Sequence, residues 1–451
     1  MELSKRLAEY VTNTSYEDLP DEVVSFTTLC ILDYFGSAFA GADKPPVQMI
    51  HHLIEEMGGE EQATLLTGGR SSVLNAALVN GAASHIMELD DIHKGSVIHA
   101  ATVVIPAALA VAEWKKRTGK DLITAVAIGY EVCFRIGEAV TPSHYYYWHN
   151  TATCGTFGAA AAAAKLLDLN VEQTIHALGS AGTQAAGLWQ FIEDGAMSKQ
   201  LHPGKAAMNG VMSALLAEKG FTGATQILEG SRGFFRAMSE KFDESKITNG
   251  LGEIFKITEN SFKVHASCRH THPAMDLMLD VTKEKTLRVE DIDEIKVGAY
   301  QAAINITNND HPTTQYASKF SLQFCTALAL LTGKGGLAQF TEETLWDEDI
   351  RALMKKVSVG VDPEIEAAYP EKWGSKVEIS LRSGEKIVIQ TEYPKGDPEN
   401  PVTSNDLVDK FMILATRLPE EKRVAFADSI LKLEKIESVR EFLASDKLPV
   451  I

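Results

Sequence analysis

The chain has 451 residues, of which 45% are hydrophobic and 23% charged, as in an ordinary globular protein. Because a single hydrophobic core stops growing at about 250 to 300 residues, this length predicts two domains. Aspartate and glutamate outnumber lysine and arginine by 61 to 43, and the net charge of -18 argues against nucleic acids and membrane surfaces as partners.

The five cysteines are scattered and form no C-x-x-C pair: Cys30, Cys133, Cys154, Cys268 and Cys325. This usage indicates a reducing compartment and argues against a disulfide framework or a zinc ribbon. Residues 1–20 are amphipathic and charged, without the apolar core of a secretion signal. We identify no unbroken apolar stretch of about 18 residues, and therefore expect a cytoplasmic protein without a membrane-spanning helix.

Helical patterns dominate the first 258 or so residues. Apolar positions recur at helical spacing in several runs, most of which close on glycine or lysine: 21–41, 73–91, 102–120, 121–140, 146–167 and 204–220. Their high content of alanine and glycine lets helices approach closely, so we interpret these runs as a tightly packed helical core.

The pattern changes after Asn260. Residues 292–300 and 355–363 alternate as strands do, and 376–393 predicts two strands joined at Ser383 and Gly384 as a hairpin. Residues 317–336 are helical, and the proline-rich segment 392–401 marks an exposed crossing before further helices.

This order predicts a mostly α protein with a smaller α+β domain. The all-helical domain is built from both chain ends, residues 1–260 and 397–451, and the α+β domain is inserted between them as residues 261–396. An inserted domain leaves a cleft at the junction, where ligand sites tend to form.

Four histidines directly precede helical runs that begin with small residues: His99, His149, His202 and His272. Unpaired N–H groups and a partial positive charge at a helix N-terminus attract anions, and small residues leave these groups accessible. Pro203 and Pro273 suit the first helical position. Any one of these histidines alone is also explained as a capping or structural residue.

Cations lie next to the same helix starts, in a chain that is acidic overall: Lys94, Lys199, Lys263 and Arg269. Their gathering beside histidines predicts a positively charged site for a small polyanion.

Several blocks carry a family resemblance: 85–113, 148–169, 197–210, 220–230 and 263–276. Their sequences, such as "HIMELDDIHKGSVIHAATVV" and "KVHASCRHTHPAMD", resemble the MmgE/PrpD family, which includes 2-methylcitrate dehydratase, cis-aconitate decarboxylase and iminodisuccinate epimerase. The resemblance implies an α+β lid domain, a homodimer, and a cleft site that needs no metal or organic cofactor.

The resemblance also implies the site residues: Asp90, Asp91, His99, His149, Lys199, Lys263 and the position of Cys268. Three positions depart from the decarboxylases of the family. Where the decarboxylases place a histidine, this chain has Cys268, with His265 and His270 nearby. Where they show a threonine, it has Ile92. Where they often have a tyrosine, it has Phe324. These departures argue against decarboxylation.

Proton transfer next to a carboxylate needs a base, an acid and cations. We assign His99 and His149 as acid and base, because the ordinary pKa of histidine lies near working pH. Asp90 and Asp91 are assigned as groups that orient histidine or lysine. Lys199 and Lys263 are the carboxylate clamps. Further substrate contacts are expected from the remaining basic and polar residues of these blocks: His265, Cys268, Arg269, His272, Lys94 and His202. An alternative candidate for the base, in place of His99, lies in the stretch that contains His265, Arg269, His270 and His272.

The leading hypothesis is a cofactor-independent lyase that dehydrates a small di- or tricarboxylate. The alternatives are an epimerase of the iminodisuccinate type, a cis-aconitate decarboxylase, and a carboxylate-binding or scaffold protein without activity. A metal pair at His270 and His272 lacks a third ligand at metal-type spacing. We interpret Cys154 as a packing residue rather than an activated thiol, and Glu88 as either a site residue or a solvated helix residue.

Overall fold

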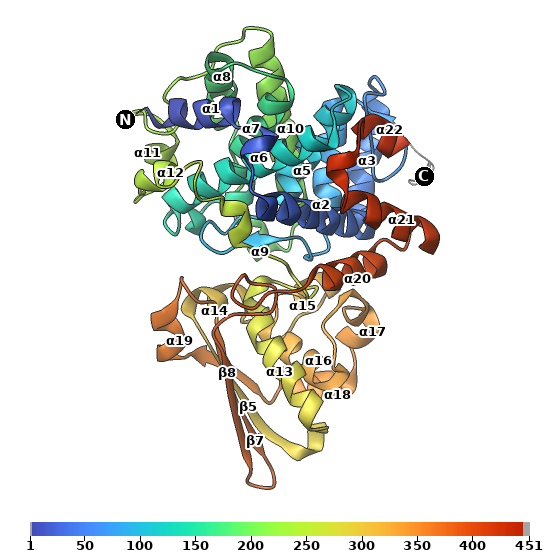
Figure 1. The fold of residues 1–451 in the computed structure, drawn as a ribbon. Coiled ribbons are helices and arrows are strands. Elements are labelled where there is room, and N and C mark those ends of the chain that lie inside the picture. Colours follow the sequence, from blue (N-terminus) through green and yellow to red (C-terminus); the bar gives the residue numbers. More distant parts are fainter. Residues whose placement is uncertain (1, 445–451) are drawn as a thin grey trace. The chain divides into compact units, whose positions relative to one another are not determined.

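The computed structural model describes residues 2–444, which form two compact units (Figure 1). The first unit holds the chain up to Ile86, then Asp90–Asn260, and the chain from Thr403 onward. The second holds Met87–Leu89 and Ser261–Val402. Helices make up 58% of the chain, and a small mixed sheet lies in its C-terminal region.

The first unit is helical apart from very short strands. Its α-helices are α1 (Leu3–Asn13), α2 (Asp21–Gly41), α3 (Pro45–Met57), α4 (Val73–His85), α5 (Ala101–Trp114), α6 (Gly119–Val140), α7 (Asn150–Leu166), α8 (Val171–Gly182), α9 (Phe191–Asp194), α10 (Ser198–Glu218), α11 (Phe234–Met238), α12 (Ser245–Thr248), α20 (Ser404–Leu414), α21 (Glu420–Ile430) and α22 (Val439–Ala444). Short strands and 3-10 turns connect them: β1 (Ala63–Thr64), β2 (Arg70–Ser71), β3 (Ile92–His93), η1 (Tyr16–Asp18), η2 (His144–Tyr146), η3 (Lys256–Glu259) and η7 (Leu433–Lys435). Strand β4 (Asn260–Ser261) ends this part of the chain.

Helix α7 forms the centre of this unit and packs against α5, α6, α8 and α10 (Figure 1). Almost every residue of its alanine-rich run is buried. Gly129 of α6 and Gly158 of α7 make the contact possible, because a Cβ on Gly158 would lie 2.6 Å from the carbonyl oxygen of Gly129. The small residues therefore pack the core, as predicted, and they fix the position of the α7 N-terminus.

Helix α2 is, among the described residues, the one helix long and apolar enough to cross a membrane, contrary to the expectation of none. Of its most apolar window, 72% is nevertheless buried inside the protein. Asp33, in the middle of α2, pairs with Nζ of Lys410 on α20 at 2.6 Å. Burial against its neighbours and this internal ion pair identify α2 as a core helix of the unit.

One predicted helix start is wrong. Helix α10 begins at Ser198, so His202 and Pro203 lie inside the helix rather than before it. Proline at this position removes one intrahelical hydrogen bond. The helix continues because it is held by its neighbours: a Cβ on the next residue, Gly204, would lie 2.2 Å from the carbonyl oxygen of Leu78 on α4. Tertiary packing overrides the local proline signal.

The second unit is an α+β structure. Its strands are β5 (Ile292–Ala299), β6 (Val357–Val361), β7 (Ser375–Leu381) and β8 (Lys386–Thr391). Its helices and 3-10 turns are η4 (Arg269–Thr271), α13 (His272–Glu284), η5 (Val289–Asp291), α14 (Gln301–Thr307), α15 (Gln315–Ser318), α16 (Leu322–Thr332), η6 (Leu337–Gln339), α17 (Glu342–Leu345), α18 (Glu348–Met354) and α19 (Pro363–Ala368).

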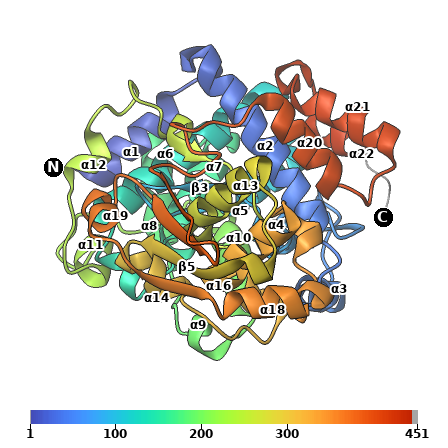
Figure 2. The same cartoon turned by 90° about the horizontal axis from the view of Figure 1, so that it is seen from below.

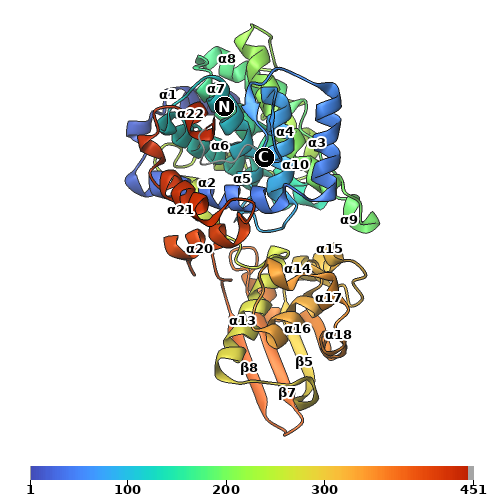
Figure 3. The same cartoon turned by 90° about the vertical axis from the view of Figure 1, so that its right-hand side faces the viewer.

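The four strands form one sheet in the order β6-β5-β7-β8. Strands β5 and β6 run parallel, and the other neighbours are antiparallel. Alternate residues of β7 are buried under the helices that cover the sheet, α13 among them (Figures 2 and 3). Gly384, with φ +88°, turns the hairpin between β7 and β8, so the predicted strands and hairpin are confirmed.

Candidate functional site

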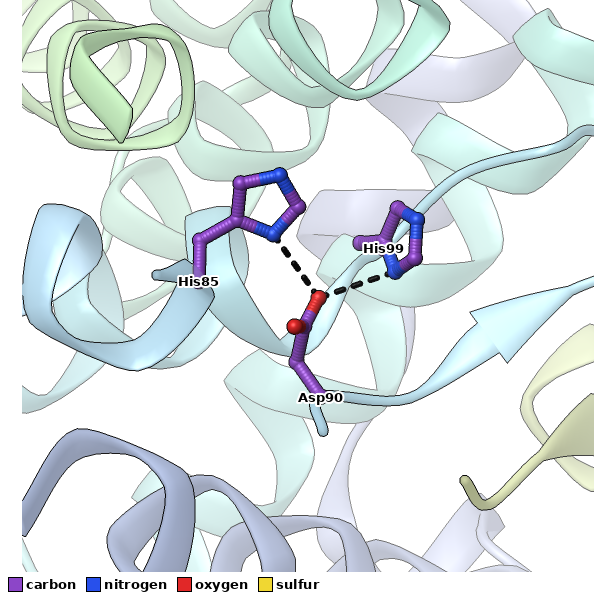
Figure 4. Close-up of side chains that lie close together, drawn as sticks. All are labelled: His85, Asp90 and His99. Atoms are coloured by element: carbon purple, nitrogen blue, oxygen red, sulfur yellow. Dashed lines mark hydrogen bonds and ion pairs between the residues drawn. The ribbon is translucent and has the colours of Figure 1, made fainter. Parts of the chain in front are cut away.

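The loop between α4 and α5 brings two histidines to one carboxylate (Figure 4). His85 is the last residue of α4, and His99 lies two residues before α5. Oδ2 of Asp90 lies 2.9 Å from Nδ1 of His85 and 2.8 Å from Nδ1 of His99. The side chains of His85 and Asp90 are fully buried, and that of His99 is 11% exposed. Asp90 therefore orients two imidazoles at once.

The acceptors around His99 determine where its proton lies. Its Nδ1 faces Oδ2 of Asp90 and, at 2.6 Å, the backbone carbonyl oxygen of Asp91. Because a carbonyl oxygen cannot donate, Nδ1 carries a hydrogen, and in the neutral ring Nε2 holds the lone pair. Burial alone would raise the pKa of Asp90, but His85 and His99 outweigh it and hold this pKa well below its usual range. The carboxylate is therefore ionised.

The same argument disfavours a metal at this cluster. His85, Asp90 and His99 are close enough to share an ion, but a metal ligand needs a lone pair, and Nδ1 of His99 is occupied by its hydrogen. A second group, His93, Glu138 and Glu259, is also compact. There Nζ of Lys256 lies 3.0 Å from an oxygen of each glutamate, so a lysine occupies the position of the cation.

Asp91 secures the loop to the helices behind it. One of its oxygens accepts from the backbone N–H of Ala101 at 3.1 Å, at the start of α5. The other accepts from Oη of Tyr130 and Nδ2 of Asn260, both at 2.7 Å. Complete burial raises the pKa of Asp91 to about 7, in spite of these three donors. Asp91 thus holds the loop in position, whereas Asp90 orients the imidazoles.

Backbone strain marks the same loop. Val97 has a φ of +53°, which is rare for a β-branched residue. Nδ2 of Asn150, the first residue of α7, donates to the carbonyl oxygen of Ser96 at 2.7 Å and holds this turn. The backbone N–H of His99 donates to Oγ1 of Thr151 at 3.1 Å. Strain maintained by such contacts is typical of functional sites.

His149 is the N-cap residue of α7, as its position in the sequence predicts. Its ring stacks 5.8 Å from that of His85 and lies 6.5 Å from that of His99, between centroids. Burial, followed by the nearby His202, His85, Lys199 and His99, lowers the pKa of His149 well below its usual 6.5. The imidazole is therefore neutral at pH 7.

Helix α10 supplies two more residues to this cluster. Nδ1 of His202 lies 3.1 Å from Nδ1 of His149, and burial lowers the pKa of His202 to about 4. Lys199, 3% exposed, is the second residue of the helix. Trp189 contacts His149 with 4.9 Å between ring centroids. A buried cation and four imidazoles thus share one region of the first unit.

Lys94 is half-buried on the turn that follows β3. It lies on the same loop as Asp90 and His99, between β3 and the start of α5. Its substrate-binding role stays a prediction.

A second group of predicted residues lies in the second unit. Nζ of Lys263, fully buried, lies 3.6 Å from Oε2 of Glu88. Glu88 also accepts from Oη of Tyr316 at 3.2 Å, and Nζ of Lys319 donates to the carbonyl oxygen of Met87 at 2.8 Å. Glu88 is 2% exposed with a φ of +59°, so the solvated-helix interpretation is wrong.

The stretch after Lys263 is held by internal contacts. Arg269 pairs with Asp397 and donates to Nδ1 of His272 at 3.1 Å. Nε2 of His272 in turn donates to the carbonyl oxygen of Ser267 at 3.2 Å. Burial, then the charge of Arg269, lowers the pKa of His272 well below 6.5. These contacts stabilise the turn, and a substrate-binding role for Arg269 and His272 stays a prediction.

The neighbouring side chains of this stretch also make contacts within the second unit. Nε2 of His265 donates to Oδ1 of Asp276 at 2.7 Å, and Nδ1 of His270 lies 2.6 Å from Oη of Tyr300. Cys268 is 8% exposed, and its backbone N–H donates to the carbonyl oxygen of Lys319 at 2.9 Å. Neither metal-compatible group among the described residues includes His270 or His272.

Two comparisons identify the family. The family model of the MmgE/PrpD N-terminal domain matches residues 5–246. The family model of the MmgE/PrpD C-terminal domain matches residues 265–435. The chain belongs to the MmgE/PrpD family.

Named relatives within the MmgE/PrpD family fall into two groups. A cis-aconitate decarboxylase of Aspergillus terreus is 26% identical over 476 residues, which cover 99% of this chain and 96% of that protein. The human cis-aconitate decarboxylase is 25% identical over 435 residues, covering 92% and 88%. The 2-methylcitrate dehydratase of Salmonella typhimurium is 24% identical over 300 residues, covering 63% and 62%.

Two of the residues that depart from the family pattern, Phe324 and Ile92, are buried. Phe324 is fully buried on α16, with its ring 6.0 Å from that of Phe340. Ile92 is 3% exposed in β3. Cys154 is also buried, and burial raises the pKa of its thiol to about 12, so it packs the core rather than acting as a nucleophile.

Pattern analysis missed three residues of these clusters: His85, Tyr316 and Lys319. His85 stands at the end of an alanine-rich helix, five residues before Asp90, where its own surroundings suggest only packing. Lys319 stands before an apolar helix and is 5% exposed. A buried lysine is rare unless it is paired, but burial is not visible in the sequence.

A cavity of about 410 Å³ in the second unit is lined by residues of β5, β6 and β7 and shares no residue with these clusters. Its two lysines face acids, because Lys296 lies 3.3 Å from Glu294 and Lys376 lies 4.0 Å from Asp362. Since its charges are balanced locally, this cavity offers no strong anion site.

Proposed function

We propose that this chain is a lyase that acts on a small di- or tricarboxylate by moving a proton to or from a carbon next to a carboxylate. The observation that carries the proposal is the contact of Nδ1 of His99 with the carboxylate of Asp90 and the carbonyl oxygen of Asp91, which places a hydrogen on Nδ1 and leaves Nε2 for the substrate. A positioned imidazole of this kind contributes about 10²- to 10⁴-fold to proton transfer.

Decarboxylation is the reaction that the relatives favour. The proteins named cis-aconitate decarboxylase match 92% to 99% of this chain, whereas the Salmonella 2-methylcitrate dehydratase matches 63%. Decarboxylation therefore replaces dehydration as the first hypothesis. In decarboxylation a C–C bond breaks, CO2 leaves, and the electron pair left on carbon takes up a proton from an acid in the site.

The residues of the first unit can take the corresponding roles. His99 and His149 exchange protons with substrate carbon, and the ammonium group of Lys199 attracts a carboxylate. A buried carboxylate that orients two imidazoles is typical of a catalytic site. This arrangement argues against the hypothesis of a scaffold protein without activity.

Epimerisation is the second candidate. The two imidazoles of His99 and His149 lie 6.5 Å apart and belong to separate helix starts. Inversion at carbon requires one group that removes a proton and another that returns one on the opposite face. Epimerisation stays a candidate because three residues of this chain differ from the decarboxylase pattern: Cys268, Ile92 and Phe324.

The deciding experiment presents cis-aconitate, 2-methylcitrate, citrate and iminodisuccinate to the purified protein in D2O. NMR then scores loss of CO2, loss of water and deuterium at carbon separately. We expect product with one fewer carboxylate from cis-aconitate. Deuterium exchange in iminodisuccinate alone would select the epimerase, and no change in any acid would overturn the proposal.

The lid role of the inserted residues 261–396 and the homodimer stay proposals that rest on the family resemblance. Light scattering on the purified full chain measures its molar mass in solution and so tests the homodimer.

A further inference from the structure

His149 and His202 share one hydrogen bond between like atoms. Nδ1 of one lies 3.1 Å from Nδ1 of the other. A hydrogen bond needs one donor and one acceptor, so only one of these two nitrogens carries a hydrogen when both rings are neutral. The two imidazoles must then be opposite tautomers. Among the described residues, neither Nε2 has a hydrogen-bonding partner.

The surroundings keep both rings neutral. His85, His99 and Lys199 face His149, and His85, Lys199 and Lys205 face His202, from α4, the loop before α5 and α10. Burial is the largest cause that lowers the pKa of each ring, and the positive charges that these groups carry or acquire on protonation lower it further. The carboxylate of Asp90 is bound to His85 and His99 instead.

The packing around the pair is built for close approach. The backbone N–H of His149 donates to the carbonyl oxygen of Gly187 at 2.9 Å. A Cβ at Gly187 would lie 2.5 Å from Cβ of Ala152 and 3.3 Å from Nδ1 of His202. A glycine therefore lets this segment pass close to the ring of His202 while it binds the backbone of His149. His202 is 9% exposed and His149 only 1%, so His202 is the member nearer to solvent.

We propose that His202 is a positioning residue that acts through His149 as the second half of a proton relay between substrate carbon and solvent. This inference rests on the proposed function for its substrate. In the resting state His149 carries its hydrogen on Nδ1 and donates to Nδ1 of His202, which carries its own hydrogen on Nε2. Nε2 of His149 then has a lone pair for the substrate.

The relay moves one proton in balanced steps. A substrate C–H bond breaks, its proton forms an N–H bond at Nε2 of His149, and the electron pair stays on carbon. The hydrogen on Nδ1 of His149 moves to Nδ1 of His202, which becomes an imidazolium ion. Its Nε2 then releases a proton to water. Both rings end neutral with inverted tautomers, and the reverse order delivers a proton from solvent to a carbanion.

Histidine tautomers can be measured without any substrate. In protein labelled with ¹⁵N-histidine, two-bond ¹H–¹⁵N spectra at pH 7.5 distinguish Nδ1–H from Nε2–H rings. We expect His149 as the Nδ1–H form and His202 as the Nε2–H form, assigned by their single substitutions. Two Nε2–H rings would overturn the relay whatever the protein's activity.

A matched pair of variants separates orientation from relay. In His202→Asn the amide oxygen can still accept from Nδ1 of His149 but cannot take up its proton, whereas His202→Phe removes both functions. We expect His202→Asn to keep the His149 tautomer, to leave KM nearly unchanged, and to lower kcat by about 10- to 100-fold. Unchanged kcat in His202→Asn would overturn the relay. If His149 and His202 are opposite tautomers but the protein turns over none of the acids, the shared hydrogen bond is supported. That result would count against the proposed function only.

Discussion

Asp90 and His99 form a charge-assisted hydrogen bond of 2.8 Å between Oδ2 and Nδ1, and the same oxygen binds His85 at 2.9 Å. One carboxylate therefore orients the imidazole rings of both His85 and His99. Its own pKa is held well below the usual range by these contacts, after they outweigh the effect of burial.

Asp90→Asn tests the role of this carboxylate. The amide cannot stabilise an imidazolium ion, and its NH2 group competes with the two Nδ1 hydrogens, so the rings adopt other tautomers. We expect kcat to fall by about 10²- to 10⁴-fold, with a smaller change in KM. Kinetics and the histidine ¹⁵N spectra of the same sample measure both effects. Full activity with a changed His99 tautomer would remove Asp90 from the mechanism.

His149→Ala and Lys199→Ala test the assigned acid-base and clamp groups. Each is expected to abolish turnover, with a fall in the thermal unfolding midpoint no larger than that of a control variant in which a buried histidine outside the cluster is replaced. His144→Ala is the matched histidine control. His144 is buried, and its ring binds the carbonyl oxygen of Met238 at 2.9 Å and Oγ1 of Thr153 at 2.7 Å.

The control separates chemistry from folding. His144→Ala should lower the unfolding midpoint, because it leaves buried polar groups unpaired, and should retain turnover. Lys219→Ala, at the exposed C-terminal end of α10, should change neither. Retained turnover in His149→Ala, together with a large loss of stability, would assign His149 to the fold.

Much of this fold is predictable from local patterns. Strands β5, β7 and β8 follow from alternation, because each is half-buried with a period of two. The position of His149 follows because N-cap residues precede a run of helical spacing. Such features depend on neighbours within one turn or one strand, which the sequence contains directly.

The cluster around Asp90 depends on contacts that no local pattern encodes. Asp90 can reach both His85 and His99 only because the chain reverses between α4 and α5, with φ values of +59° at Glu88 and +53° at Val97. Neither residue type favours this conformation. His202 was misplaced for the same kind of reason, since helix packing at Gly204 overrides the proline before it.

The pH dependence of stability tests the buried Asp91. Its pKa of about 7 lies above the usual 3.8, so the folded chain holds a proton that the unfolded chain has released. The stabilisation from this proton is complete below about pH 4 and is lost as pH rises to about 7. Wild type should therefore lose about 3 kcal/mol relative to Asp91→Asn between pH 5 and pH 8. Denaturant unfolding at both pH values measures this difference, and parallel behaviour of the two proteins would contradict the raised pKa.

Gly158→Ala tests the contact that positions α7. The new Cβ would meet the carbonyl oxygen of Gly129 at 2.6 Å and Cβ of Cys133 at 2.8 Å, and neither neighbour can rotate away. We expect a loss of about 1 to 3 kcal/mol in the free energy of unfolding. Gly360→Ala is the control, because nothing lies within 4 Å of its added Cβ. Equal stability of the two variants would contradict close helix packing.

Arg269→Met tests the internal role of a residue that the sequence assigns to substrate. The change leaves the carboxylate of Asp397 buried without its arginine and removes the donor to Nδ1 of His272. Breaking a buried ion pair from one side costs about 3 to 5 kcal/mol, so the unfolding midpoint should fall strongly. Arg288→Met removes an exposed arginine that also pairs with an acid, Asp291 at 3.1 Å, and should produce no measurable change. If Arg269→Met instead keeps its midpoint and raises KM, Arg269 binds substrate and the ion pair with Asp397 contributes little to stability.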